Sequence, residues 1–85
     1  MRDLDPQLLR LREVEARIAF GERLVRDQRA MIRKLASQGH TATLAHELLA
    51  SLQESLGILE ERRRTILAMM QATDPPLAEY VARVR

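Results

Sequence analysis

The sequence predicts an all-α fold, an antiparallel two-helix hairpin of coiled-coil type that carries a short third helix at its C-terminal end. Two stretches have apolar side chains at seven-residue spacing, which is typical of a helix that packs along a partner helix. A single break, Gly39-His40, separates the two stretches. Each stretch is about 30 residues long, and equal lengths joined by a short connection favour a hairpin.

The first helix is expected over residues 6–38. Asp5 followed by Pro6 is a start signal, because Asp caps unpaired N–H groups of the first turn and Pro lacks one of them. Gly39 suits the left-handed residue that closes a helix, and His40 lies where a cation meets the carbonyl end. The seam of this helix consists of Leu4, Leu11, Val14, Ile18, Val25, Ile32 and Leu35.

The second helix is expected over residues 44–72, after a turn over residues 39–43. Either Thr41 or Thr43 can cap this helix through its hydroxyl oxygen, and the sequence favours neither of them. The seam of the second helix consists of Ala45, Leu49, Leu52, Leu56, Leu59, Ile66 and Met70.

After the second helix, Thr73-Asp74-Pro75-Pro76 ends one helix and offers the cap and first turn of another. We expect a short helix over residues 75–84 that packs near the open end of the hairpin. A docking segment for a partner and a frayed end are the alternatives. The apolar side chains of this segment recur at helical spacing, at Leu77, Tyr80, Val81 and Val84.

Counting outward from the turn gives the expected register of the two seams. The pairs are Leu35–Ala45, Ile32–Leu49, Gln28–Leu52, Val25–Leu56, Gly21–Leu59, Ile18–Arg63, Val14–Ile66 and Leu11–Met70. Gln28 either fixes the register as a polar seam residue or lies at the seam edge and reaches water. Arg63 is expected to lay its stem along the seam and carry its charge to Glu15 or Glu22. Gly21, which costs about 1 kcal/mol relative to Ala in a helix, indicates either a close helix approach or tolerated drift.

A second set of apolar residues flanks the two seams. Residues 1–85 form a single domain, and a chain of this size buries only about 60–65% of the surface that its unfolded form exposes. The flanking residues make each helix apolar over a wider arc than one partner helix can cover. We therefore expect a homodimer, a four-helix bundle with twofold symmetry, although another protein's helix could cover the same surface. The flanking residues are Phe20, Leu24, Met31, Leu44, Leu48, Ile58 and Met69.

Four arginines of the first helix form a candidate nucleic-acid contact, which is the alternative function. Two copies in a dimer would extend this basic surface along the phosphates of a nucleic acid. The charge pattern favours a plain solvated surface instead, because several Glu–Arg pairs follow the i, i+4 spacing and the net charge is only +2. Nucleic acid is therefore the less favoured partner. The four residues are Arg12, Arg23, Arg26 and Arg33.

The residue types needed for catalysis or cofactor binding are scarce. No cysteine is present, so neither a disulfide nor a thiolate metal site can form. Aromatic residues make up 2% of the chain, which leaves few surfaces for stacking on bases or flat cofactors. His40 and His46 lack the spacing of metal ligands, and no glycine-rich phosphate loop or nucleophilic triad is present. We expect no cofactor, no bound metal and no enzymatic activity.

The hydropathy pattern also bears on location. The first residues lack the apolar run of a signal peptide, and no stretch approaches the roughly 20 apolar residues of a membrane span. We expect a cytoplasmic protein without a membrane partner. Together these observations predict a non-enzymatic assembly or protein-interaction module.

One segment resembles a known group of sequences. The run from Arg17 to Arg23, the turn Gly39-His40 and the pair Leu48-Leu49 are similar to those of short uncharacterised alpha-proteobacterial helical-hairpin proteins. The resemblance covers roughly residues 15–67. It implies a helical hairpin with a Gly-His turn, and it implies no known activity.

Overall fold

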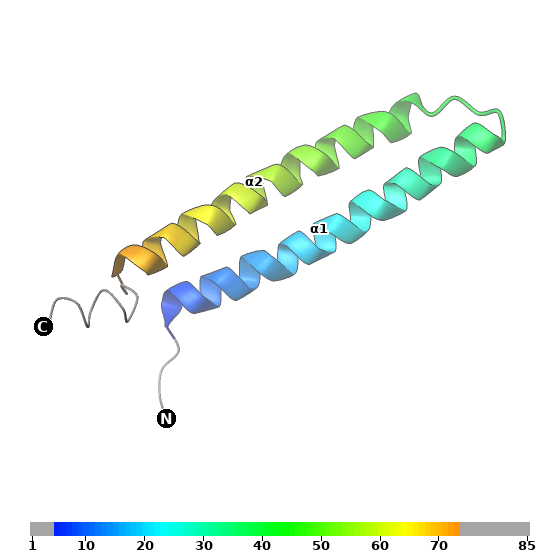
Figure 1. Cartoon of the computed structure of the whole chain (residues 1–85). Coiled ribbons are helices and arrows are strands. Elements are labelled where there is room, and N and C mark those ends of the chain that lie inside the picture. The colour runs from blue at the N-terminus through cyan, green and yellow to red at the C-terminus, as the bar shows by residue number, and fades with distance from the viewer. Residues whose placement is uncertain (1–4, 74–85) are drawn as a thin grey trace, which may run out of the picture.

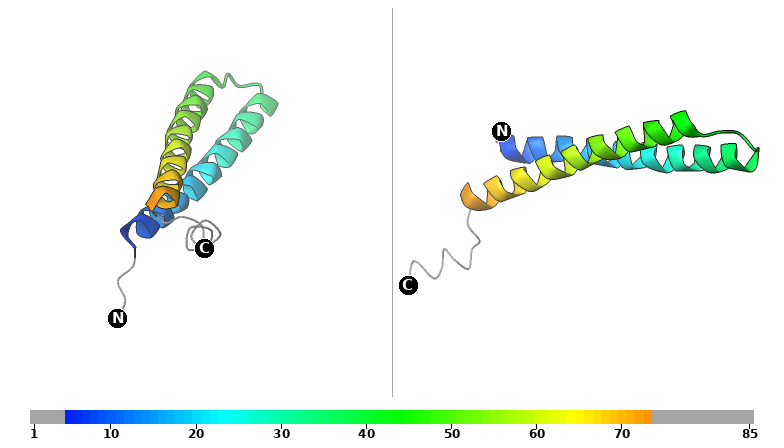
Figure 2. Two further views of the ribbon diagram at one scale, coloured as in Figure 1. Left: turned by 60° about the vertical axis from the view of Figure 1, so that its left-hand side comes forward. Right: turned by 90° about the horizontal axis from the view of Figure 1, so that it is seen from above.

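Two long helices, joined in a hairpin, form the part of the chain that the computed structural model describes, residues 5–73 (Figure 1). Helix α1 spans Pro6–Ser37 and helix α2 spans Thr43–Thr73. They run antiparallel, contact each other and cross at a shallow angle (Figure 2). The predicted all-α two-helix hairpin is confirmed, and the helix expected over residues 75–84 lies outside the described residues.

Helix α1 begins at the cap that the sequence predicts. The Asp5 carboxylate accepts a hydrogen bond from the Gln7 backbone N–H at 2.9 Å. The Asp5 backbone carbonyl accepts the first helical bond, from the Leu9 N–H at 3.1 Å. Because a cap of this kind contributes about 1 kcal/mol, the start of the helix is determined locally.

Helix α1 ends in a Schellman motif centred on Gly39. This residue has a φ of +76°, the left-handed conformation that favours glycine. The Gly39 N–H donates to the Ala36 carbonyl at 3.1 Å, and the His40 N–H donates to the Leu35 carbonyl at 3.0 Å. The prediction for Gly39 is confirmed, and His40 takes part in the turn through its backbone.

The start of helix α2 differs from the prediction. The His46 N–H donates to the Ala42 carbonyl at 2.9 Å, so Ala42 occupies the N-cap position. The expectation that Thr41 or Thr43 caps this helix was therefore wrong. Ala42 is half-buried, whereas both threonines are exposed.

The interface between the helices is a single apolar seam. Val14, Val25 and Ile66 are buried, with 3%, 6% and 9% of their surfaces exposed. The other apolar seam residues of the described part are half-buried, because one neighbouring helix covers only one side of each. These residues are Leu11, Ile18, Ile32, Leu35, Ala45, Leu49, Leu52, Leu56, Leu59 and Met70.

The register of the seam differs from the predicted one by about one helical turn. A Cβ on Gly21 would meet the Leu56 side chain, whereas counting from the turn paired Gly21 with Leu59. Arg63 binds Glu15, a reach that the predicted register also allowed, so the contact with Gly21 is the one that shows the shift. The count assumed that the two helices end level, but α1 extends past the start of α2 at the turn (Figure 1).

Candidate interaction surface

The hairpin has two broad faces, and grooves between the helices mark both of them. Glu60 and Arg64 line grooves on one face, which we call the charged face, and Arg62 lines a groove on the other. Because Arg62 is two residues away from each of them on α2, it points to the opposite side of the helix. The charged face holds two grooves of about 530 and 370 Å³, and the opposite face holds one of about 320 Å³. The grooves of the charged face are lined by Ile18, Glu22, Val25, Arg26, Arg29, Gln53, Leu56, Glu60, Arg63 and Arg64, and the opposite groove by Arg10, Glu13, Val14, Arg17, Arg62 and Ile66.

All seven flanking residues predicted for an interface lie on the same face as Arg17 and Arg62. Phe20 and Leu24 follow Arg17 by three and seven residues, which places them on its side of α1. Ile58 precedes Arg62 by four residues, with the same consequence for α2. Met31 follows Leu24 by seven residues and therefore lies on the same side of α1. On α2, Met69 follows Arg62 by seven residues, and Leu48 and Leu44 precede Arg62 by fourteen and eighteen, so all three share the side of Arg62. We call the surface formed by the seven residues the apolar face.

Six residues of the apolar face are exposed. Leu44 is 80% exposed and Ile58 is 58% exposed, while Leu24 is half-buried at the edge of the seam. If a large apolar side chain offers about 200 Å², these six expose on the order of 600 Å². Soluble monomers rarely expose a larger contiguous apolar patch. The other exposed members are Phe20, Met31, Leu48 and Met69.

Leu9 is a further exposed apolar residue that the sequence reasoning missed. It is 46% exposed and precedes Phe20 by eleven residues, so the two side chains lie close in angle around α1. That eleven-residue spacing was the available signal. It was hidden because Leu8 and Leu9 stand next to the seam residue Leu11 in the sequence.

The polar seam residue Gln28 joins the two helices. Its side-chain Nε2 donates to the Ala45 backbone carbonyl at 2.9 Å in a partly buried position. Of the two roles that the sequence left open, the structure shows a polar contact across the seam. Ala45 lies seven residues before Leu52, the neighbour expected from the sequence, so the long Gln28 side chain reaches about one turn beyond the shifted register.

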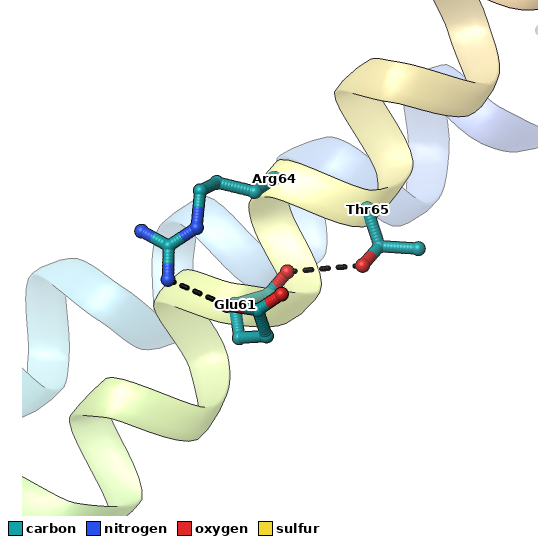
Figure 3. Close-up of polar contacts among 3 residues, drawn as sticks. All are labelled: Glu61, Arg64 and Thr65. Atoms are coloured by element: carbon teal, nitrogen blue, oxygen red, sulfur yellow. Dashed lines mark hydrogen bonds and ion pairs between the residues drawn. The ribbon is translucent and has the colours of Figure 1, made fainter.

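Two ion pairs lie on exposed surface. The Arg63 guanidinium donates to the Glu15 carboxylate at 3.0 Å, which confirms the expected reach of Arg63. Arg64 donates to the Glu61 carboxylate at 2.7 Å, and the Thr65 hydroxyl donates to the Glu61 backbone carbonyl at 3.2 Å (Figure 3). The hydrogen bond that Arg64 donates to Glu61 and the negative charge of that carboxylate raise the pKa of Arg64. Exposed pairs of this kind contribute little to stability.

The four arginines proposed for nucleic-acid contact are exposed, but they do not form a uniformly basic surface. Arg26 lines the larger groove of the charged face together with Arg29, Glu22 and Glu60. Two positive and two negative side chains therefore share this groove. The other three of the four are Arg12, Arg23 and Arg33, all on exposed positions of α1.

In residues 5–73 no group of three or more His, Cys, Asp or Glu side chains could hold a metal ion. Neither α1 nor α2 is both long and apolar enough to cross a membrane. Comparison with protein-family models, with curated proteins and with solved structures finds no match to this chain. The exposed apolar side chains themselves make the apolar face the candidate interaction surface.

Proposed function

We propose that this protein is a non-enzymatic assembly module in which two hairpins pack through their apolar faces into a four-helix bundle. The observation that carries the proposal is the set of six exposed large apolar side chains on one face. Each partner of a standard interface buries about 800 Å², and the exposed apolar area supplies most of it. A twofold dimer uses the same patch on both copies, so one apolar face is sufficient.

The thin core supports the same proposal. Only Val14, Val25 and Ile66 are buried in the described hairpin, and a pair of helices with one seam is marginally stable in water. Packing of a second hairpin on the apolar face would bury the half-exposed edges of the seam as well. Association would then contribute to the stability of the fold itself.

Sedimentation equilibrium at micromolar concentrations tests the proposal. The chain is expected to have the mass of a dimer, and the double variant Phe20→Glu/Ile58→Glu that of a monomer, because each change buries a charge in the interface. The matched control is Ala19→Glu/Ala50→Glu, which places the same charges at exposed positions outside the apolar face. A monomeric unmodified chain with full helix content would overturn the proposal.

Another protein's helix is the competing occupant of this surface. Its signature would be a monomeric chain that unfolds at low temperature until a partner is added. Nucleic-acid binding through Arg12, Arg26 and Arg33 would instead show fluorescence-anisotropy binding to duplex DNA that weakens steeply with salt. We place it second because Glu22 and Glu60 share the groove of Arg26.

A further inference from the structure

We infer that the two hairpins of the dimer pack with their turns pointing in opposite directions, an orientation that rests on the self-association proposed above. The twofold axis would then run across the hairpins, so that α1 lies against α1 of the partner and α2 against α2. The alternative places both turns at the same end. The distribution of charge along the apolar face decides between the two.

Among the described residues, five of the seven exposed large apolar side chains lie between the middle of the hairpin and the turn, while Leu9 and Met69 lie near the open end. The contact between Gly21 and Leu56 sets the level of one helix against the other, so Phe20 and Ile58 lie nearly level. From there toward the turn, α1 adds Leu24 and Met31, and α2 adds Leu48 and Leu44. Eleven residues separate Phe20 from Met31, so this apolar stretch is about 17 Å long.

In the other half of the same face, a charged groove separates this apolar stretch from Leu9 and Met69. The groove, of about 320 Å³, is lined by Arg10, Arg17 and Arg62 with the single carboxylate Glu13. Three positive charges and one negative charge leave an excess of two positive charges per hairpin. This groove begins within a turn of Phe20 and extends toward the open end, away from the turn.

In a dimer with both turns at the same end, the charged groove of one hairpin would face the same groove of the partner hairpin. Six arginines and two glutamates would then meet in one desolvated region, and like charges that are brought together there oppose association. With the turns at opposite ends, the apolar stretches of the two hairpins still overlap, because the twofold axis passes through the middle of each stretch. The two grooves then lie at the far ends of the bundle.

The separation of the grooves in the second arrangement is large. The middle of the apolar stretch lies about five residues after Gly21 on α1. Because Gly21 is level with Leu56 and the helices are antiparallel, this middle is level with Ser51, five residues before Leu56. Arg17 and Glu13 lie about 9 to 13 residues from that level, so the two grooves are about 27 to 39 Å apart along the bundle. This exceeds the Debye length of about 8 Å at physiological salt, so their mutual repulsion is screened.

Distances between spin labels test the orientation. Because the chain has no cysteine, a single introduced cysteine is the only site that a thiol-specific label can modify. Gln38→Cys labels the turn, and Ala50→Cys labels the level of the expected axis from outside the apolar face; both positions are exposed. Gln38 lies twelve residues beyond the level of Ser51. Turns at opposite ends predict labels at Gln38→Cys that are roughly 36 Å apart and labels at Ala50→Cys within roughly 30 Å.

The outcomes are separable. Labels within roughly 20 Å at Gln38→Cys would place the turns together and overturn the orientation, while the dimer itself would stand. The absence of any dipolar coupling at both positions, with a monomeric mass, would overturn the proposed function and the orientation with it. The background Phe20→Glu/Ile58→Glu is the control, because coupling that depends on the apolar face must disappear there.

Discussion

Gly21 and Leu56 meet at the middle of the hairpin, where a Cβ on Gly21 would lie 3.3 Å from the Leu56 Cδ1 atom. Leu56 therefore occupies the space that the missing side chain leaves. This contact explains why a residue of low helix propensity stands inside α1, at a seam position where the sequence otherwise places apolar side chains. It also sets the level of the two helices, on which the proposed dimer geometry depends.

Two glycine substitutions are expected to differ. Gly57→Ala should raise the free energy of unfolding by about 1 kcal/mol, because nothing lies within 4 Å of the added methyl group. Gly21→Ala should raise it by clearly less, because Leu56 must move by a few tenths of an ångström. Urea unfolding of both variants at one protein concentration measures the difference. Equal gains would show that Leu56 moves without cost.

The polar contact of Gln28 is expected to select the register at some cost in stability. Gln28→Leu should raise the free energy of unfolding by about 1 kcal/mol, because an apolar side chain would replace a partly buried amide. Without the bond to Ala45, sliding by one turn should become populated, and extra amide resonances should appear for residues near it. Lower stability with one set of resonances would contradict this role.

Thermal unfolding should depend on protein concentration. If the apolar face is covered by a second copy, the Tm of the unmodified chain rises with concentration, because association stabilises only the folded form. In Phe20→Glu/Ile58→Glu the Tm should be lower and independent of concentration. Circular dichroism over a hundredfold range of concentration provides the measurement. An unmodified chain whose Tm does not move would argue that the hairpin is stable alone.

The exposed ion pair of Arg63 and Glu15 should contribute little. A double-mutant cycle with Arg63→Gln and Glu15→Gln is expected to give a coupling energy of about 0.2–1 kcal/mol that falls in 1 M salt. Both side chains are 44% exposed, so water competes for their hydrogen bonds. A larger coupling that resists salt would mean that association buries the pair, which would move the interface to the charged face.

The ends of α1 could be predicted because each depends on a few neighbouring residues. The Asp5 carboxylate bonds an N–H two residues away, and the Gly39 turn closes on carbonyls three and five residues before the donors. The heptad period likewise separated seam from flank, since the seam residues are half-buried or buried while Phe20 and Ile58 are exposed. These features follow from local geometry, which the order of residues specifies directly.

The register of the two helices was decided only by the tertiary structure. An apolar seam position recurs every three or four residues, so sliding α2 by one turn past α1 exchanges one apolar pair for another at little cost. The pattern alone could not distinguish Leu56 from Leu59 as the neighbour of Gly21. The close approach of Leu56 to Gly21 shows which register is adopted, and that approach arises only when the two helices meet.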